Sequence, residues 1–151
     1  MFSSDTIVSM ANGTFKNINH ITVNDMILDK LNTSVRVVRT SVHPEHICVG
    51  IQLNNGTGVF YCDPNVKFLC HNILNNGNVV SQYSSISSIN EFSGISSKLK
   101  SSSKVFSNQS DVSITTYNDP TDHIKKDLYC LYTNDGTQTF YVNKVITMCD
   151  M

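Results

Sequence analysis

The sequence contains 151 residues, of which 15% are charged, with 11 Lys plus Arg against 12 Asp plus Glu, so it fits a single domain, residues 1–151, with one hydrophobic core. No basic run concentrates positive charge and no apolar stretch approaches the roughly 20 residues that cross a bilayer, which excludes nucleic acid and membrane as expected partners. Ser, Asn and Thr supply most of the remaining polarity, a composition that favours short strands joined by turns over long helices.

The first elements along the chain are predicted to be short strands. Residues 7–10 and 14–18 flank the turn Ala11-Asn12-Gly13, and Asn-Gly readily takes the positive φ angles of a tight hairpin turn. Brief strands are expected at residues 21–23 and 26–28.

The next segment predicts two hairpins. The β-branched run at 34–42 is expected to end at Pro44 and to pair with residues 47–53, because proline lacks a backbone donor and favours a bend. The strongest turn signal, Asn54-Asn55-Gly56-Thr57-Gly58, predicts that residues 47–53 pair also with residues 59–62.

Extended structure is expected to resume at residues 66–70, with a turn at Asn75-Asn76-Gly77 before Val79 and Val80. Between Ser81 and Ser110 the composition becomes Ser-rich with few large apolar residues. Such a segment buries too little apolar surface to offset the entropy of ordering, so we predict a mobile loop within it.

The last elements are predicted strands at residues 112–117, 128–133 and 137–146. The turn Asn134-Asp135-Gly136 is expected to join the last two as a hairpin. No apolar 3.6-residue period persists for three turns anywhere in the chain, so the predicted fold class is all-β.

The cysteines indicate a reducing environment. They form no CxxC pair and are odd in number, and they lie in apolar or strand-like surroundings: Cys48, Cys62, Cys70, Cys130 and Cys149. We therefore expect buried thiols in an intracellular compartment, the cytoplasm or a virion. The Asn-, Ser- and Ile-rich composition is common in chains from AT-rich genomes, such as those of phages, large viruses and protists.

One group of residues has the chemistry of metal ligands. His43, His46 and Cys48 stand close together around a bend, and zinc binds such nitrogen and sulfur donors. Strong zinc sites come as two close pairs, however, and here an exposed bend followed by a buried Cys48 is the favoured interpretation. We expect no metal and no cofactor.

Two segments carry a resemblance to a known family. The opening MFSSDTIVSMANGTFKNINHITVNDMIL and the closing LYCLYTNDGTQTFYVNKVITMCD resemble the first and last blocks of the hedgehog/intein (Hint) self-processing domains. The resemblance implies a compact, pseudo-two-fold β domain of many short strands and hairpins, whose two termini lie on central strands.

The resemblance also implies where the chemistry of the family would lie. In Hint domains a Cys or Ser at the first position attacks the preceding carbonyl and forms a thioester or ester. Here Met1 holds that position, and its thioether has no proton to lose. A Thr and a His of the second block match Cys62 and Asn65, and Asn65 cannot donate a proton as His does.

The closing block departs from the family pattern in the same way. The family's Asp matches Cys130, and its His near the turn matches Gln138. The terminal His-Asn pair falls on Met148-Cys149 or on Cys149-Asp150, depending on a one-residue shift. These matches predict a Hint-like domain without self-splicing chemistry, a structural or protein-interaction module whose partner is a host polypeptide or an assembly. The alternative is a self-processing domain that Met1 silences.

Overall fold

The computed structural model describes residues 1–73, 79–85, 104–106, 111–116, 123–135 and 138–148. Within these ranges the chain forms strands and a single short 3-10 helix, η1 (Ile18–His20). The strands are β1 (Phe2–Ser3), β2 (Ile7–Ser9), β3 (Phe15–Asn17), β4 (Met26–Leu28), β5 (Ser34–Ile47), β6 (Val49–Leu53), β7 (Val59–Cys62), β8 (Lys67–Ile73), β9 (Val79–Ser85), β10 (Lys104–Phe106), β11 (Asp111–Thr116), β12 (Lys125–Thr133), β13 (Thr139–Val142) and β14 (Val145–Met148).

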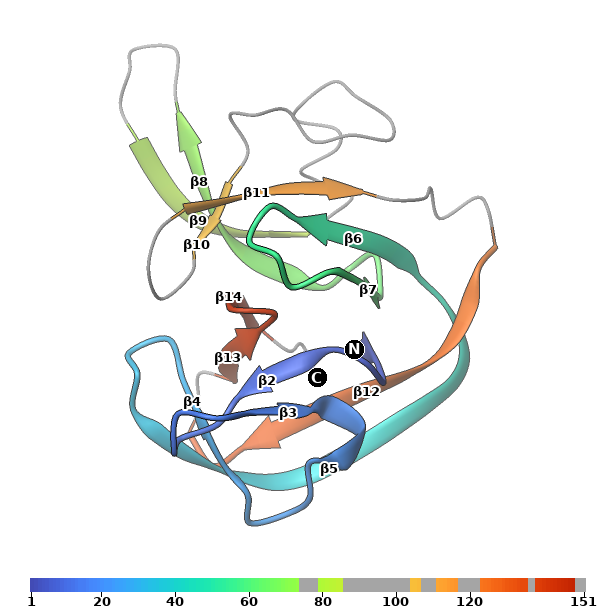
Figure 1. The fold of residues 1–151 in the computed structure, drawn as a ribbon, viewed down its shortest axis with the longest axis vertical. Helices are drawn as coiled ribbons and strands as arrows, with labels where there is room; N and C mark the ends of the chain where they lie inside the picture. The colour runs from blue at the N-terminus through green and yellow to red at the C-terminus, as the bar shows by residue number, and fades with distance from the viewer. Residues whose placement is uncertain (74–78, 86–103, 107–110, 117–122, 136–137, 149–151) are drawn as a thin grey trace.

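The strands form an antiparallel β architecture, which confirms the predicted fold class. Neighbouring strands follow the order β3-β2-β13-β14-β8-β10-β11-β6-β7-β1-β12-β5-β4, and β9 pairs with β8. Strands β6 to β11 occupy one half of the molecule and β2 to β5 with β12 the other, and the N-terminus lies in the middle (Figure 1). The described part of the chain has no helix with the length and apolar character needed to span a membrane.

Four phenylalanine rings form the centre of the core. The ring of Phe2 lies 6.4 Å from Phe60, 6.5 Å from Phe68 and 6.1 Å from Phe140, measured between centroids. All four side chains are fully buried, and the contacts of Phe2 have the tilted or edge-to-face geometry that aromatic pairs prefer. The N-terminal strand is therefore packed into the core through its first aromatic residue.

Hairpins with a glycine turn are confirmed where the turn lies among the described residues. β2 pairs with β3 across Gly13, whose φ is 85°. β6 pairs with β7 across Gly56 and Gly58, whose φ angles are 80° and 83°. Glycine suits these turns because it has no Cβ to clash at positive φ.

Two predicted elements lie partly outside the described residues. β8 pairs with β9 as expected, while the turn predicted between them falls at residues 74–78, which the structure does not describe. The Ser-rich segment 81–110 begins within β9 and includes β10, and its remaining residues 86–103 and 107–110 also lie outside the described ranges.

The strand predicted at residues 21–23 is wrong. These residues follow η1, and the Thr22 N–H donates to Asp25 Oδ2 at 3.0 Å. The Asn24 N–H donates to the Val37 carbonyl at 2.8 Å, with Asn24 at a φ of 78°. The Asp25 carboxylate thus stabilises a local turn, which competes with extended structure in a run of only three residues.

The predicted bend at Pro44 is also wrong. β5 is a continuous strand of 14 residues that includes Pro44. Its partners are β4 and β12 instead of residues 47–53. The ladder with β12 shifts register between Lys126 and Leu128, so the β5 backbone passes Pro44 and Glu45 in a bulge. A bulge tolerates proline because the missing N–H is not needed there.

The last predicted hairpin is corrected as well. Residues 137–146 were expected to form one strand, but they contain β13 and the start of β14, which pair with each other. Asn143 and Lys144 form the turn at φ angles of 45° and 67°, as a two-residue hairpin turn requires. β12 pairs with β1 and β5 and not with β13.

Candidate functional site

Strand β1 brings the first residue against the loop that follows β7. Phe2 lies opposite Cys62 on one side and Tyr129 on the other, and the Asp63 N–H donates to the Met1 carbonyl at 3.1 Å. Met1 is half-buried and packs on the core. The structure therefore places Met1, Cys62 and the loop that holds Asn65 side by side, three positions that the resemblance matches to the site of the family.

The last described strand reaches the same loop. Met148 lies opposite Lys67, directly after this loop, and the Thr147 hydroxyl donates to the Lys67 carbonyl at 2.8 Å. Residues 63–67 thus contact the first residue through Asp63 and the end of β14 through Lys67. Cys149 and Asp150 lie outside the described residues, so their predicted place in the site is not described.

Burial makes the Cys62 thiol unreactive. Its side chain has no exposed surface, and desolvation raises the pKa of the thiol to about 12. A thiolate, the nucleophilic form of cysteine, is therefore nearly absent at neutral pH. Burial also raises the pKa of Cys48.

The loop after β7 holds Asn65 at the edge of a small hollow. The Asn65 N–H donates to Asp63 Oδ1 at 2.7 Å, which forms a tight turn. The hollow has a volume of about 100 Å³ and is lined by Met1, Asp63, Asn65 and Val66. Asn65 is exposed, so its amide can bind a carbonyl or water there but cannot release a proton as an acid.

The structure adds one pair that the sequence analysis did not connect with this site. Nε2 of His46, at the end of β5, lies 3.3 Å from Asp63 Oδ2. Nδ1 of the same ring lies 2.8 Å from the Ile47 carbonyl oxygen, to which it donates. His46 thus contacts the residue whose backbone holds Met1. Sequence spacing gives no signal for this pair, because strand pairing in the folded chain brings the two residues together.

The arrangement of strands matches solved intein structures. The MchDnaB-1 intein (N145AA) superimposes with a TM-score of 0.65 at 12% identity, covering 99% of this chain and 100% of that chain. The DnaB intein from Synechocystis sp. PCC 6803 gives 0.65 at 16% identity over 99% and 98%. The gp41-1 intein gives 0.62 at 17% identity over 98% and 97%.

The chain has the Hint fold of inteins. This confirms the resemblance of the opening and closing segments. At these identities the likeness concerns the fold, and the sequence itself matches no family description and no curated protein.

In this Hint fold, Gln138 is engaged within its own turn. Its Nε2 donates to the carbonyls of Thr133 at 3.1 Å and Asp135 at 3.2 Å, and its Oε1 accepts from the Thr133 N–H at 3.1 Å. Three hydrogen bonds fix the side chain to the turn between β12 and β13. Among the described contacts, none joins Gln138 to Met1 or to the loop after β7.

Cys130 is buried in β12 next to Tyr129, which lies opposite Phe2. Cys48 and Cys62 are also buried, and neither is disulfide-bonded.

The structure does not assemble the weak zinc candidates. The ring of His43 contacts the Ser41 hydroxyl at 3.3 Å, that of His46 faces Asp63, and the Cys48 thiol donates to the Ile124 carbonyl at 3.5 Å. Within the described ranges, no three His, Cys, Asp or Glu side chains lie together as a metal site requires.

Proposed function

We propose that this chain is a Hint-fold domain without self-splicing chemistry that serves as a protein-interaction module. The observation that carries the proposal is the environment of position 1. A thioether stands where Hint domains use a thiol or hydroxyl, and the adjacent Cys62 is kept protonated by burial. Asn65, at the position of the family's catalytic His, cannot protonate a departing amide.

The closing block supports the same conclusion. Gln138 replaces a residue that would exchange protons, and its amide is committed to Thr133 and Asp135. Cys130, which is buried in β12, replaces an acid and has no carboxylate. Substitutions at several separate positions agree better with loss of the reaction than with one silencing change. What remains is a folded shell with strand edges and loops for a protein partner, either a host polypeptide or a member of an assembly.

One observation favours a second candidate, a self-processing domain that Met1 alone silences. The His46–Asp63 pair touches the loop that binds residue 1, and a positioned histidine is a common general acid. With cysteine at position 1, the thiolate would attack the preceding carbonyl and the amide nitrogen would take a proton from a ring nitrogen of His46. The C–N bond would then break, leaving a thioester.

The two candidates are separated by restoring the nucleophile in a protein that carries a peptide tag ahead of residue 1. Met1→Cys, Met1→Ala and the double variant Met1→Cys/Asn65→His are incubated with dithiothreitol, and products are followed by intact mass. We expect Met1→Cys to stay whole, as does the Met1→Ala control. Thiol-dependent loss of the tag from Met1→Cys would show that the machinery survives and would overturn the proposal.

The double variant and a further substitution assign the proton donor. If the tag is lost from Met1→Cys/Asn65→His but not from Met1→Cys, the chain lacks the catalytic His of the second block and the proposal stands. If Met1→Cys cleaves by itself and the added substitution His46→Ala stops cleavage, His46 is the proton donor and the second candidate is correct.

A further inference from the structure

Four polar side chains gather on one face of the ribbon formed by β5 and β12. Arg39 lies directly opposite Tyr132 in the ladder, and its guanidinium carbon is 4.0 Å from the centroid of the Tyr132 ring. The Ser41 hydroxyl lies 3.4 Å from the Tyr132 hydroxyl and 3.3 Å from Nε2 of His43. Alternate residues of a strand share a face, so Arg39, Ser41 and His43 follow one another along the same side of β5. We call these four residues the Arg39 cluster.

Three members of the cluster are held in place by their surroundings. Ser41, His43 and Tyr132 are half-buried, and Tyr132 packs on the core, whereas Arg39 is exposed. The ladder between β5 and β12 shifts register between Tyr132 and Thr133, directly beside the Arg39–Tyr132 pair. Such an irregularity bends a strand and changes the direction of the side chains next to it. The guanidinium therefore lies at the solvent side of a fixed platform.

All four side chains of the cluster can donate hydrogen bonds. A guanidinium that stacks on an aromatic ring keeps the N–H groups in its own plane available for an acceptor. The hydroxyls of Ser41 and Tyr132 each have one hydrogen that rotates, and a histidine Nε2 donates when it is protonated. The cluster therefore offers several N–H and O–H donors and one permanent positive charge on a small area.

Among the described residues, no carboxylate forms an ion pair with Arg39. The ribbon contains no Asp or Glu at residues 34–44 or 128–133. Asp135, which follows the ribbon, accepts a hydrogen bond from the Thr133 hydroxyl at 2.6 Å. An arginine with such neighbours is suited to an anionic ligand, because charge-assisted hydrogen bonds to an oxyanion are stronger than neutral ones.

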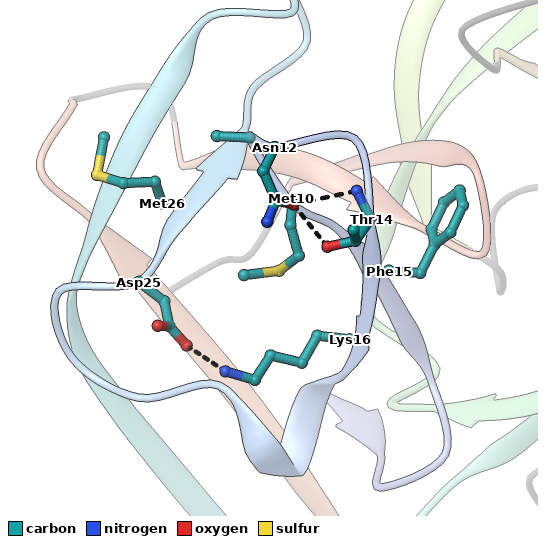
Figure 2. Close-up of a pocket in the computed structure, with 8 residues that line it drawn as sticks. Met10, Asn12, Thr14, Phe15, Lys16, Asp25 and Met26 are labelled. Atoms are coloured by element: carbon teal, nitrogen blue, oxygen red, sulfur yellow. Dashed lines mark hydrogen bonds and ion pairs between the residues drawn. The ribbon is translucent and has the colours of Figure 1, made fainter.

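The cation in a larger hollow of the molecule differs in this respect. The hollow has a volume of about 730 Å³ and lies over the end of β2, between β3 and β4, with Lys16 among its lining residues. Lys16 Nζ is 3.0 Å from Asp25 Oδ2 (Figure 2). Because Asp25 already neutralises Lys16, an anion that entered this hollow would meet a carboxylate. We therefore expect anions to prefer the Arg39 cluster.

We propose that the Arg39 cluster binds the phosphate group of a phosphate monoester. Such a group carries a charge of about −1.5 to −2 at neutral pH and has three acceptor oxygens. The guanidinium of Arg39 donates to two of these oxygens, and the Ser41 hydroxyl and the His43 ring donate to the third. A carboxylate has only two oxygens and would leave part of this donor set unused. The inference goes beyond the proposed function and does not depend on whether the chain processes itself.

The test uses two probes that share the phosphate chemistry, inorganic phosphate and the capped peptide Ala-Ala-phosphoserine-Ala-Ala. Each is titrated into the whole protein at neutral pH and constant ionic strength, and the NMR shifts of the Arg39 side-chain N–H and the His43 ring are followed. We expect saturable shifts with a Kd for inorganic phosphate on the order of 1–10 mM. The unphosphorylated peptide should cause none. Tighter binding of the phosphopeptide than of inorganic phosphate would support the site and assign its ligand to a modified protein, and equal binding would support it as a site for phosphate alone.

Arg36 provides a matched control for Arg39. Both are exposed arginines of β5, so Arg36→Gln and Arg39→Gln remove the same charge from the same strand. Arg39→Gln should weaken the binding of both probes by about fivefold or more, whereas Arg36→Gln should change it by less than about twofold. Tyr132→Phe keeps the ring beneath Arg39 and removes the hydroxyl, so it should weaken binding by about two- to threefold.

Three results would overturn the proposal. One is the absence of saturable shifts at about 50 mM phosphate. Another is an equal loss of binding in Arg36→Gln and Arg39→Gln, which would show general attraction to a positive surface. The third is equal binding of the phosphorylated and unphosphorylated peptides. None of these measurements involves residue 1, so the phosphate site can fail while the absence of self-processing stands.

Discussion

At the scale of single residues, burial determines how reactive the thiol of Cys62 is. A thiol whose pKa is raised to about 12 has a thiolate fraction on the order of 10⁻⁴ at pH 8, against roughly a quarter for an ordinary cysteine. We expect iodoacetamide to label Cys62 at least about 1000-fold more slowly in the native protein than in guanidinium, as peptide mapping can measure. The control is Ser4→Cys, at an exposed position beside β1. Equal labelling rates at the two sites would contradict the prediction.

Asn143 is the residue on which the β13–β14 turn depends most. Its Oδ1 accepts from the Ile7 N–H at 3.0 Å, and its backbone has a φ of 45°. Asn143→Ala would leave that N–H unpaired in a partly buried setting and keep the unfavourable φ, so the free energy of unfolding should fall by about 1–3 kcal/mol in urea titration. Lys144→Gly in the same turn should instead raise it by up to about 1 kcal/mol. A loss of stability in Lys144→Gly would show that the turn is held in another way.

At the scale of elements, the bulge in β5 determines how that long strand crosses the molecule. Glu45 lies at a φ of 48°, and its N–H donates to Asp127 Oδ1 at 3.1 Å. Glycine adopts this conformation freely, whereas a β-branched residue does not. Glu45→Gly should therefore be neutral or stabilise by up to about 1 kcal/mol, and Glu45→Val should destabilise by about 1–3 kcal/mol. The midpoint of urea unfolding measures both, and a stable Glu45→Val would mean that the bulge can move along the strand.

The turns and bulges differ in how well they can be predicted from the sequence. The hairpins at Gly13 and Gly56 were predictable because glycine beside Asn signals a positive φ locally. The β13–β14 turn was missed because Asn143-Lys144 lacks glycine and is held by distant contacts, with Ile7 and with Asn55, whose Nδ2 donates to the Asn143 carbonyl at 2.9 Å. Pro44 was misinterpreted because the bulge that accommodates it depends on β12, far away in the sequence.

Part of the site geometry also agrees with the sequence analysis. The resemblance matched Met1 to the family's first position and Cys62 and Asn65 to its second block, and in the structure these residues lie close to one another. The contact of His46 with Asp63 could not be predicted, because it follows from the path of β5 through the bulge. The hydrogen bonds of Gln138 to Thr133 and Asp135 were likewise not predicted, because they depend on the local path of the backbone after β12.

At the scale of the whole molecule, β1 connects the two halves of the fold. It pairs with β7 and with β12, and Phe2 packs on rings from β7, β8 and β13. A strand of two residues has few backbone bonds of its own, so its place depends on the burial of this ring. The N-terminal residue is consequently held by the hydrophobic core.

Phe2→Ala tests whether the halves unfold together. Removing a fully buried ring costs about 3–5 kcal/mol, and if β1 joins the halves, the loss should lower a single urea transition without changing its slope m. Far-ultraviolet and near-ultraviolet circular dichroism should report the same midpoint. Phe15→Ala is the control. Phe15 is 49% exposed, and the Lys144 ammonium lies 5.4 Å from its ring centroid. This substitution should lower the free energy of unfolding by about 1 kcal/mol or less. Two separate transitions in Phe2→Ala, or a cost no larger than that of Phe15→Ala, would show that the halves fold independently of β1.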